Sequence, residues 1–286
     1  MLFYLTLAAY CLTYYLAAGL AINVTYHRCL SHRSFRLWKP LERLLVLLGL
    51  PAGTPVQWAG NHRFHHAHAD QTEDPHSPVQ DGFWHAHVGW YIGTEKPFVC
   101  LLYSLAGPLR TLYDGWHRPR SNQQYNHLAQ DVAADKFYNL ISQPVPFMLG
   151  CWLHTLISFG WAYFIWGWAG LMALWVTLAG IYNLGDAIDS IAHLYGLRPY
   201  RAEHFARNNK WLGILTLGEG WHANHHVFPH SARHGLLENQ FDAVWEIIKF
   251  MQKLGVISQV KLPVKEQIQA KLSAVASPES QPCKIN

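Results

Sequence analysis

Six histidines of this 286-residue chain recur in two runs with the same spacing, HxxHH, and this spacing constrains the fold most. They are His62, His65, His66, His222, His225 and His226. Residues at i, i+3 and i+4 lie on one face of an α-helix, so each run directs three imidazoles toward one place. Three imidazoles repel one another when protonated and pack poorly on apolar groups. The spacing therefore predicts two helices that carry metal ligands, and a third pair, His27 and His32, stands in the run HRCLSH.

Long uncharged stretches alternate with these polar runs. Half of the residues are hydrophobic and only 14% are charged, with no Lys or Arg before Arg28 and none between Lys136 and Arg198. Residues 1–24, 144–166 and 168–192 are each long enough to cross a hydrocarbon core of about 30 Å. The first lacks the basic start of a signal peptide. We therefore expect an all-α integral membrane protein with transmembrane helices at 1–24, 144–166 and 168–192.

The positions of the histidine runs determine the expected topology. Residues 41–58 are apolar but contain Pro51, Gly53 and Pro55, and a crossing there would separate the first two runs on opposite membrane faces. We expect this segment at the interface, and residues 67–140 in a cytosolic helical cap that carries the histidines. Basic residues around the runs agree with a cytoplasmic location. Residues 241–257 are expected to form an amphipathic helix. One domain is expected over 1–271, with a disordered tail at 272–286.

Four motifs carry a resemblance to a known family. They are HRCLSHRSF (27–35), HRFHHAHADQTEDPHSP (62–78), DSIAHLYGLRPY (189–200) and GEGWHANHHVFPHSARHGL (218–236). From about residue 11 to residue 245 the chain resembles a membrane-bound fatty-acid desaturase of the Δ9 type. The motif wording is most similar to the bacterial, cyanobacterial and plant branch. This resemblance adds His193 to the expected ligands.

The resemblance implies a chemistry. Nine imidazoles exceed what one ion accepts, so two metals are the economical interpretation, and spacing alone does not choose among zinc, copper and iron. The family implies two irons that activate O2 and remove two vicinal hydrogens to leave a cis double bond. The substrate would be an acyl chain on a membrane lipid or a CoA thioester. Gly60 and Asn61 replace a charged pair of the animal acyl-CoA enzymes, which favours lipid. No cytochrome b5 segment is visible, so a separate donor of the ferredoxin or cytochrome b5 type is expected.

Further residues receive narrower roles. Asp189 stands where relatives usually have asparagine, four residues before His193, and it either binds a metal directly or accepts a hydrogen bond from a ligand. Cys11, Tyr15 and Gly19 lie about a turn apart and are either the wall of an acyl tunnel or ordinary helix packing. Asp70, Glu73 and Asp74 either orient ligands or form a solvated loop. We assign His76 a supporting or packing role, and His127, His204 and His234 to the surface or cap.

Other functions have less support. A membrane hydroxylase or monooxygenase of the same superfamily would share the metals and the oxidant. A metal-binding or transport protein would place polar residues across the bilayer, and the uncharged stretches contain no such chain of residues. The net charge is only +4 and no nucleic-acid-binding motif is present, so nucleic acid is not an expected partner.

Overall fold

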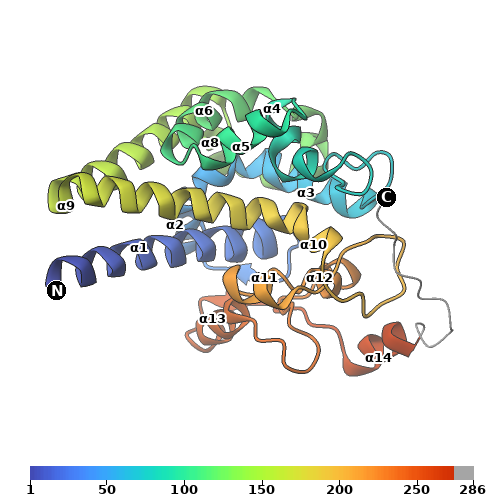
Figure 1. The fold of residues 1–286 in the computed structure, drawn as a ribbon. Coiled ribbons are helices and arrows are strands. Elements are labelled where there is room, and N and C mark those ends of the chain that lie inside the picture. The colour runs from blue at the N-terminus through green and yellow to red at the C-terminus, as the bar shows by residue number, and fades with distance from the viewer. Residues whose placement is uncertain (274–286) are drawn as a thin grey trace.

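The computed structural model describes residues 1–273, which are mostly helical (Figure 1). Helix α1 (Leu2–Leu20) continues without a break into a π-helix at Ala21–Ser31. The expected helix at 1–24 is therefore present but extends further, and His27 lies inside it rather than beyond its end. In the wider turns of the π-helix, the amide of His32 donates to the carbonyl oxygen of His27, five residues earlier. Such turns are frequent at functional sites.

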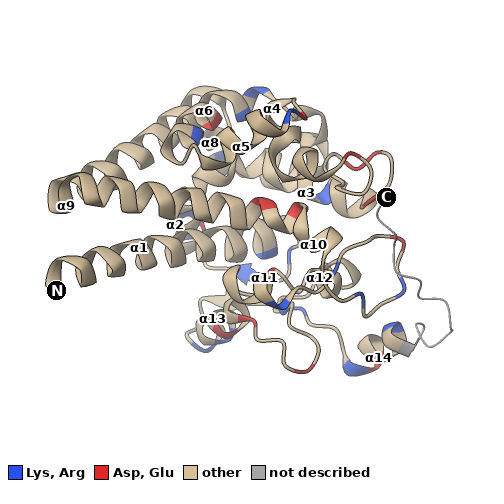
Figure 2. Cartoon of the chain, viewed as in Figure 1, with Lys and Arg blue, Asp and Glu red and all other residues tan. Residues whose placement is uncertain are grey.

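Helix α9 (Pro144–Asp189) is a hairpin of two helical arms. Gly167 interrupts it with φ +60° and ψ −145°, which matches the expected pair of helices at 144–166 and 168–192. Figure 1 shows the two arms meeting at the left, with α1 beside the second arm. Figure 2 shows no Lys, Arg, Asp or Glu along α1 or at the turn between the two arms of α9. By length and composition, two helical stretches of the described chain, Leu2–Ser31 and Pro144–Leu194, are apolar enough to cross a membrane.

The segment at 41–58 folds as a helix, a tight turn and the start of another helix. These are α2 (Lys39–Leu48), a 3-10 turn at Leu50–Ala52 and α3 (Pro55–His68). Thr54 begins α3, since its hydroxyl accepts a hydrogen bond from the amide of Gln57 at 3.2 Å and Pro55 occupies the first turn. The first HxxHH run lies on α3, as predicted.

Short helices make up the expected cap at 67–140. They are a π-turn at His85–Gly89, α4 (Trp90–Ile92), α5 (Pro97–Leu105), α6 (Pro108–His117), 3-10 turns at Arg118–Arg120 and Gln123–Ala129, α7 (Gln130–Ala133) and α8 (Lys136–Ile141). Helix α5 exposes Phe98, Leu102 and Leu105, so this region is less polar in space than its sequence indicates.

The chain after α9 returns to the first histidines. It forms α10 (Ile191–Leu194), α11 (Lys210–Leu215), α12 (His222–Val227), α13 (Ala243–Lys253) and α14 (Lys265–Ser273). Strand β1 (Arg36–Leu37) pairs antiparallel with β2 (Ile257–Ser258). The expected amphipathic helix is α13, which buries Val244 and Ile248. The expected tail at 272–286 starts inside α14, and residues 274–286 lie outside the described part.

The π-helix lies between two apolar cores. Tyr26 and Leu30 pack into one core with Val46 and Phe147, whereas Val24 packs into the other with Ile248. Because both flanks of the π-helix are packed, His27 is held at a fixed position between them.

Candidate metal centre

The structure brings all nine expected ligand histidines together in two buried groups. The first group contains His27, His32, His62, His66 and His225, and the second contains His65, His193, His222 and His226. Within each group the ring nitrogens lie within 4.8 Å of one another. The expected ligands come from the π-helix and the residue that follows it, and from α3, α10 and α12, so segments that are far apart in sequence meet at one site.

The Nε2 atoms of each group converge. In the first group, the distance between these atoms is 3.0 Å for His27 and His225, and 2.7 Å for His32 and His62. In the second group, Nε2 of His222 lies 3.0 Å from Nε2 of both His193 and His226. Two imidazole nitrogens about 3 Å apart are separated as neighbouring ligands of one metal ion are, at bond lengths of about 2.0–2.1 Å.

Three buried carboxylates hold the opposite nitrogen, Nδ1, of one ligand each. Nδ1 of His27 donates to Glu219 at 2.6 Å, Nδ1 of His65 to Asp74 at 2.9 Å, and Nδ1 of His193 to Asp70 at 2.8 Å. A neutral imidazole that donates a hydrogen bond from Nδ1–H to a carboxylate presents a bare lone pair at Nε2. The carboxylates therefore prepare these three histidines as ligands.

This arrangement fits bound metal ions. The lone pairs of His193 and its neighbours converge, and lone pairs at such distances repel one another unless a cation lies among them. Burial, followed by the neighbouring imidazoles, lowers the pKa of His222, His225 and His226 well below the usual value. These rings are therefore neutral at pH 7, as ligation requires. The donor set of five and four imidazoles fits two transition-metal ions.

The sequence interpretation missed Glu219 and misplaced His234. His234 was expected at the surface or in the cap, but it is fully buried, and its ring centroid lies 4.5 Å from that of His225. Its Nδ1 lies 3.0 Å from the Glu219 carboxylate, which also pairs with buried Arg28 at 2.8 Å. Glu219 stands three residues before His222 in the quoted motif, which was the available signal. His204, which was also expected at the surface or in the cap, is half-buried, and its ring centroid lies 4.9 Å from that of His226.

The acidic residues that follow the HxxHH run of α3 divide into two kinds. Asp70 and Asp74 are buried and bonded to ligand histidines, whereas Glu73 is exposed. The ring of His76 stacks on that of His65, with 4.2 Å between ring centroids. The two aspartates are therefore placed to orient His65 and His193, whereas the exposed Glu73 fits a solvated loop.

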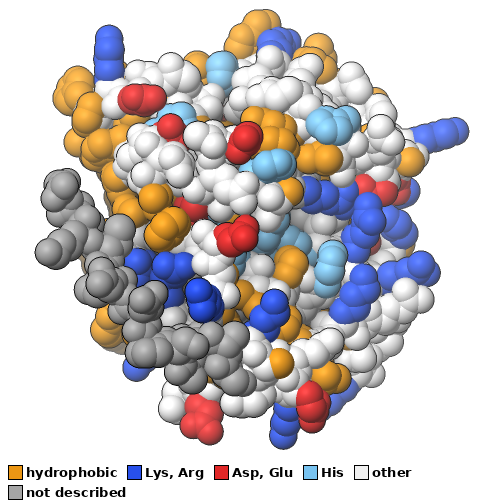
Figure 3. All heavy atoms as spheres, turned by 90° about the vertical axis from the view of Figure 1, so that its right-hand side faces the viewer, with side chains coloured by type: hydrophobic (Ala, Val, Ile, Leu, Met, Phe, Trp, Pro, Cys, Tyr) orange, Lys and Arg blue, Asp and Glu red, His pale blue; other side chains and the backbone are white. Residues whose placement is uncertain are grey.

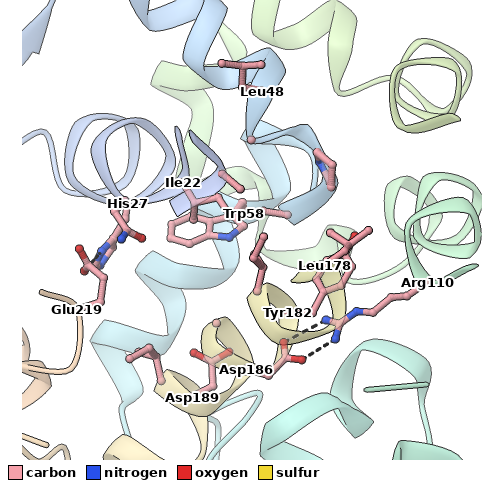
Figure 4. A pocket seen from close by; sticks show the side chains of 18 of the residues that line it. Ile22, His27, Leu48, Trp58, Arg110, Leu178, Tyr182, Asp186, Asp189 and Glu219 are labelled. Carbon is pink, nitrogen blue, oxygen red and sulfur yellow. Dashed lines mark hydrogen bonds and ion pairs between the residues drawn. The ribbon is translucent and has the colours of Figure 1, made fainter. Parts of the chain in front are cut away.

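Asp189 belongs to neither group. Helix α9 ends at Asp189 and α10 starts at Ile191, so Asp189 and His193 do not share one continuous helix. Its carboxylate instead lines a cavity of about 940 Å³, part of which is open to solvent. In Figure 4, His27 and Glu219 lie on one side of this cavity, and Arg110, bonded to Asp186, lies on the other.

The face of the first helix that lines the cavity lies next to the face that the sequence predicted. The lining residues are Tyr14, Ala18 and Ile22, spaced by one helical turn each. Cys11, Tyr15 and Gly19 are not among them. The Tyr15 hydroxyl donates to the carbonyl oxygen of Leu215, and a Cβ on Gly19 would lie 3.0 Å from Leu217. Helix α1 thus lies beside the cavity, as predicted. Cys11, Tyr15 and Gly19, however, lie about 100° around the helix from the lining residues and face α11.

Comparison with known proteins agrees with this site. The family model described as fatty acid desaturase matches residues 5–253. The chain is 34% identical to the sn-1 stearoyl-lipid 9-desaturase of Anabaena variabilis, covering 90% of this chain and 84% of the relative. It is 35% identical to the Synechocystis protein of the same name, covering 88% and 70%.

A plant relative completes the comparison. The protein named "Probable lipid desaturase ADS3.2, chloroplastic" from Arabidopsis thaliana is 35% identical over 88% of this chain, which spans 63% of that relative's length. The family match covers all four motifs and both histidine groups. The chain is an oxidoreductase that belongs to the fatty acid desaturase family.

Proposed function

We propose that the protein is an O2-dependent acyl desaturase that introduces a cis double bond at the Δ9 position of a saturated chain carried on a membrane lipid or a CoA thioester. The observation that carries the proposal is that the cavity is lined by members of both metal groups. His27 and His62 of the first group and His222 of the second line it. A chain bound there would pass directly beside both metals.

The proposed cofactor is two iron ions, one in each group, with the nine histidines as ligands. Bound iron supplies, with O2 and two electrons, the oxidant that an unactivated C–H bond requires. The protein's own residues hold the chain and exclude water. The indole of Trp58 stacks on His62 with 4.9 Å between ring centroids, and Ile22 and Leu178 add apolar wall to the cavity. Asp189 is a further candidate beside the metals, as a ligand or as a hydrogen-bond acceptor.

We also propose that α1 and both arms of α9 span a membrane. Large apolar side chains on their free surface are exposed, including Leu156, Phe164 and Trp168. Such a surface is typical of lipid contact and unusual in water. The histidine groups would then lie on the cytoplasmic side, since Lys and Arg gather at that end. Figure 3 shows basic side chains beside histidines on this face, which suits an acidic electron donor of the ferredoxin or cytochrome b5 type.

A fatty-acid profile tests the reaction. The protein is expressed in a desaturase-deficient host with a co-expressed electron donor, and double bonds are located by derivatisation and gas chromatography with mass spectrometry. We expect a new cis-Δ9 monoene with the wild type, none with His226→Ala, and an unchanged amount with the matched control His127→Ala, because His127 is exposed and belongs to neither histidine group.

The alternatives give different products. A hydroxylated lipid in place of the monoene would identify a hydroxylase. Absence of both products from a purified, iron-loaded protein with a working donor would contradict the desaturase proposal and favour metal binding or transport.

A further inference from the structure

Helices α5 and α6 form a hairpin that lies against both arms of α9 (Figure 1). The indole of Trp175, on the second arm, donates a hydrogen bond of 2.9 Å to the carbonyl oxygen of Leu105. The indole of Trp152, on the first arm, donates one of 3.1 Å to the carbonyl oxygen of Leu112. The hairpin turns at Gly107, where a Cβ would lie only 2.7 Å from the Trp175 ring. The turn between α5 and α6 is therefore packed directly on the second arm.

The tip of this hairpin lies far along the second arm. At 1.5 Å per residue, that arm is about 33 Å long, which matches a hydrocarbon core of about 30 Å. Trp175, which contacts the tip, lies about 21 Å along the arm from Asp189, the arm's end on the side of the metal groups. Helices α5 and α6 have 9 and 10 residues, so each is only about 14–15 Å long. The hairpin therefore has the length to enter such a core, reach its middle and return.

The surface of the hairpin is apolar. Five of its large side chains are more than half exposed, namely Phe98, Leu102, Leu105, Leu109 and Trp116. Between Pro97 and His117 the sequence has only two Lys, Arg, Asp or Glu residues, Arg110 and Asp114, and both are buried. The apolar surface adjoins that of the first arm at Trp152, which is itself 44% exposed. A continuous apolar surface of this kind is typical of contact with lipid.

The backbone at the tip is hydrogen-bonded to the protein. The carbonyl oxygen of Ser104 accepts from the side-chain amide of Asn183 at 2.9 Å, as that of Leu105 accepts from the second arm. Backbone amides within the turn donate to the carbonyl oxygens of Tyr103, Ala106 and Gly107. In water, carbonyls at a helix end are often left to solvent, whereas in hydrocarbon each must find a partner in the protein. Five consecutive carbonyls at the tip meet the stricter requirement.

The charges of the hairpin are distributed as a membrane requires. The guanidinium of Arg110 donates to both carboxylate oxygens of Asp186, on the second arm, at 2.6 and 3.0 Å. Such a pair is how an ionised side chain is accommodated at membrane depth. Exposed charges flank the hairpin instead, with Lys96 before α5 and Arg120 after α6. The guanidinium carbon of Arg120 lies 3.7 Å from the ring centroid of Trp116. Basic residues and Trp are typical of the cytoplasmic membrane interface.

From these observations we infer that α5 and α6 form a re-entrant hairpin, which enters the hydrocarbon core from the cytoplasmic side and contacts the acyl chains of bilayer lipids with its exposed surface. This inference rests on the proposed function, in that the arms of α9 are taken to span the membrane. It moves residues 97–117 out of the cytosolic cap expected for 67–140. The hairpin also covers Arg110 and Asp186, which line the cavity, so this polar part of the cavity wall is shielded from lipid.

Cysteine labelling of the full chain in phospholipid nanodiscs, which leave both membrane faces open to water, tests the inference. Exposed positions are changed one at a time, as Leu102→Cys and Leu105→Cys on the hairpin, Leu156→Cys on the first arm and Gln124→Cys in the cap. The parent Cys283→Ser supplies the background from the other native cysteines, and iron content equal to that of the parent reports an intact fold.

The expected result is protection of the hairpin. Because a thiol in hydrocarbon forms little thiolate, a charged maleimide should modify Leu102→Cys and Leu105→Cys about tenfold or more slowly than Gln124→Cys. Their rates should match that of Leu156→Cys, and all four variants should react equally after unfolding in detergent.

A second measurement identifies what covers the hairpin. Phosphatidylcholine with a diazirine in the middle of one acyl chain is incorporated into nanodiscs with the unmodified protein and irradiated, and adducts are located by peptide mass spectrometry. We expect lipid adducts on residues 97–109 and on both arms of α9, and none on the exposed part of residues 123–129 in the cap. Protection of Leu102→Cys without lipid adducts on residues 97–109 would mean that protein covers this surface, and would overturn the inference.

The results separate this inference from the proposed function. Labelling of Leu102→Cys and Leu105→Cys as fast as Gln124→Cys, with Leu156→Cys protected, would overturn the re-entrant hairpin alone. Rapid labelling of Leu156→Cys as well would contradict the spanning arms and overturn the hairpin with them. Neither measurement uses turnover, so the fatty-acid profile tests the desaturase reaction independently.

Discussion

The Asp74 carboxylate determines which nitrogen of His65 faces the second metal group. Asp74→Ala removes the acceptor that fixes this ring, and the loss of such a partner typically weakens metal affinity about 10- to 100-fold. We expect lower iron content after dialysis against a weak chelator, with activity falling in parallel. Glu73→Ala is the matched control, because the adjacent Glu73 is exposed. Equal iron retention in the two variants would show that the His65–Asp74 bond, 2.9 Å long, does not support the site.

Asp189 gives a second prediction, which distinguishes its two proposed roles. Asp189 belongs to neither histidine group but lines the cavity beside them. Asp189→Asn preserves shape and removes the charge, so we expect full iron content and a modest change in turnover. Iron is measured by elemental analysis and turnover by product formation. Loss of one of two irons would instead establish that Asp189 is a direct ligand.

The residues recognised from sequence were those whose partners lie nearby along the chain. The HxxHH spacing is local, so it identified ligand positions on α3 and α12. Two of the three supporting carboxylates are not local: Glu219 is 192 residues from His27, and Asp70 is 123 residues from His193. His234 has no local signal at all, because a histidine in a loop looks the same whether its ring is exposed or buried.

At the scale of elements, Gly167 allows α9 to reverse direction. Its φ of +60° with ψ of −145° is a conformation that residues with a Cβ rarely adopt, and no atom crowds the position. Gly167→Ala should therefore cost about 1–3 kcal/mol of the free energy of unfolding through backbone strain alone. Gly160→Ala, inside the first arm and equally uncrowded, should instead stabilise the helix by about 0.5–1 kcal/mol. Thermal unfolding in detergent compares the variants, and equal effects would contradict this role of Gly167.

The face that α1 turns toward the cavity gives a fourth prediction. Tyr14 lines the cavity, and its hydroxyl lies 2.9 Å from Nε2 of His154 on the first arm of α9. Tyr14→Ala removes the ring that narrows the cavity between α1 and the first arm of α9. Acyl chains two or more carbons longer should therefore be accepted. Tyr15→Ala, on the neighbouring face, should leave the product profile unchanged. Gas chromatography of products from mixed chain lengths decides, and a shift with Tyr15→Ala alone would restore the face expected from sequence.

The sequence predicted the long apolar helices but not their rotation about the helix axis. Uncharged length alone was sufficient to place α1 and the two arms of α9. Which side of α1 faces the cavity depends on its packing against α9, and one residue along a helix turns the side chain by about 100°. The continuation through the π-helix was also not predictable, because Ala21–Ser31 is held by the two cores that flank it.

At the scale of the whole molecule, the chain folds so that its start and its end build one site. The expectation that all histidine runs lie on the same side requires an even number of membrane crossings between the second and third runs. The two arms of α9 would supply two such crossings if they span a membrane, as proposed above. The metal groups then join the π-helix and α3 to α10 and α12. A polar network beside them makes the same connection through Arg28, which lies between Glu219 and Asp242.

This network gives the last prediction. Arg28 is fully buried, and its guanidinium donates to Glu219, to Asp242 and, at 2.7 Å, to the carbonyl oxygen of Ala232. Arg28→Ala would leave two buried carboxylates without their cation, which typically costs about 3–5 kcal/mol. The control Arg33→Ala removes a 59% exposed side chain paired with Asp131, worth at most about 1 kcal/mol.

The two arginine variants are compared by denaturant unfolding after metal removal, so that the ligand groups do not compensate for the lost network. We expect the C-terminal helices to separate from the π-helix at lower denaturant in Arg28→Ala. Asp242 also begins α13, where its side chain accepts a hydrogen bond of 2.9 Å from the amide of Trp245. The loss of stability in Arg28→Ala should therefore extend to this helix. If both variants unfolded at the same denaturant concentration, the two ends of the chain would be held together by the metal groups and apolar packing without a contribution from Arg28.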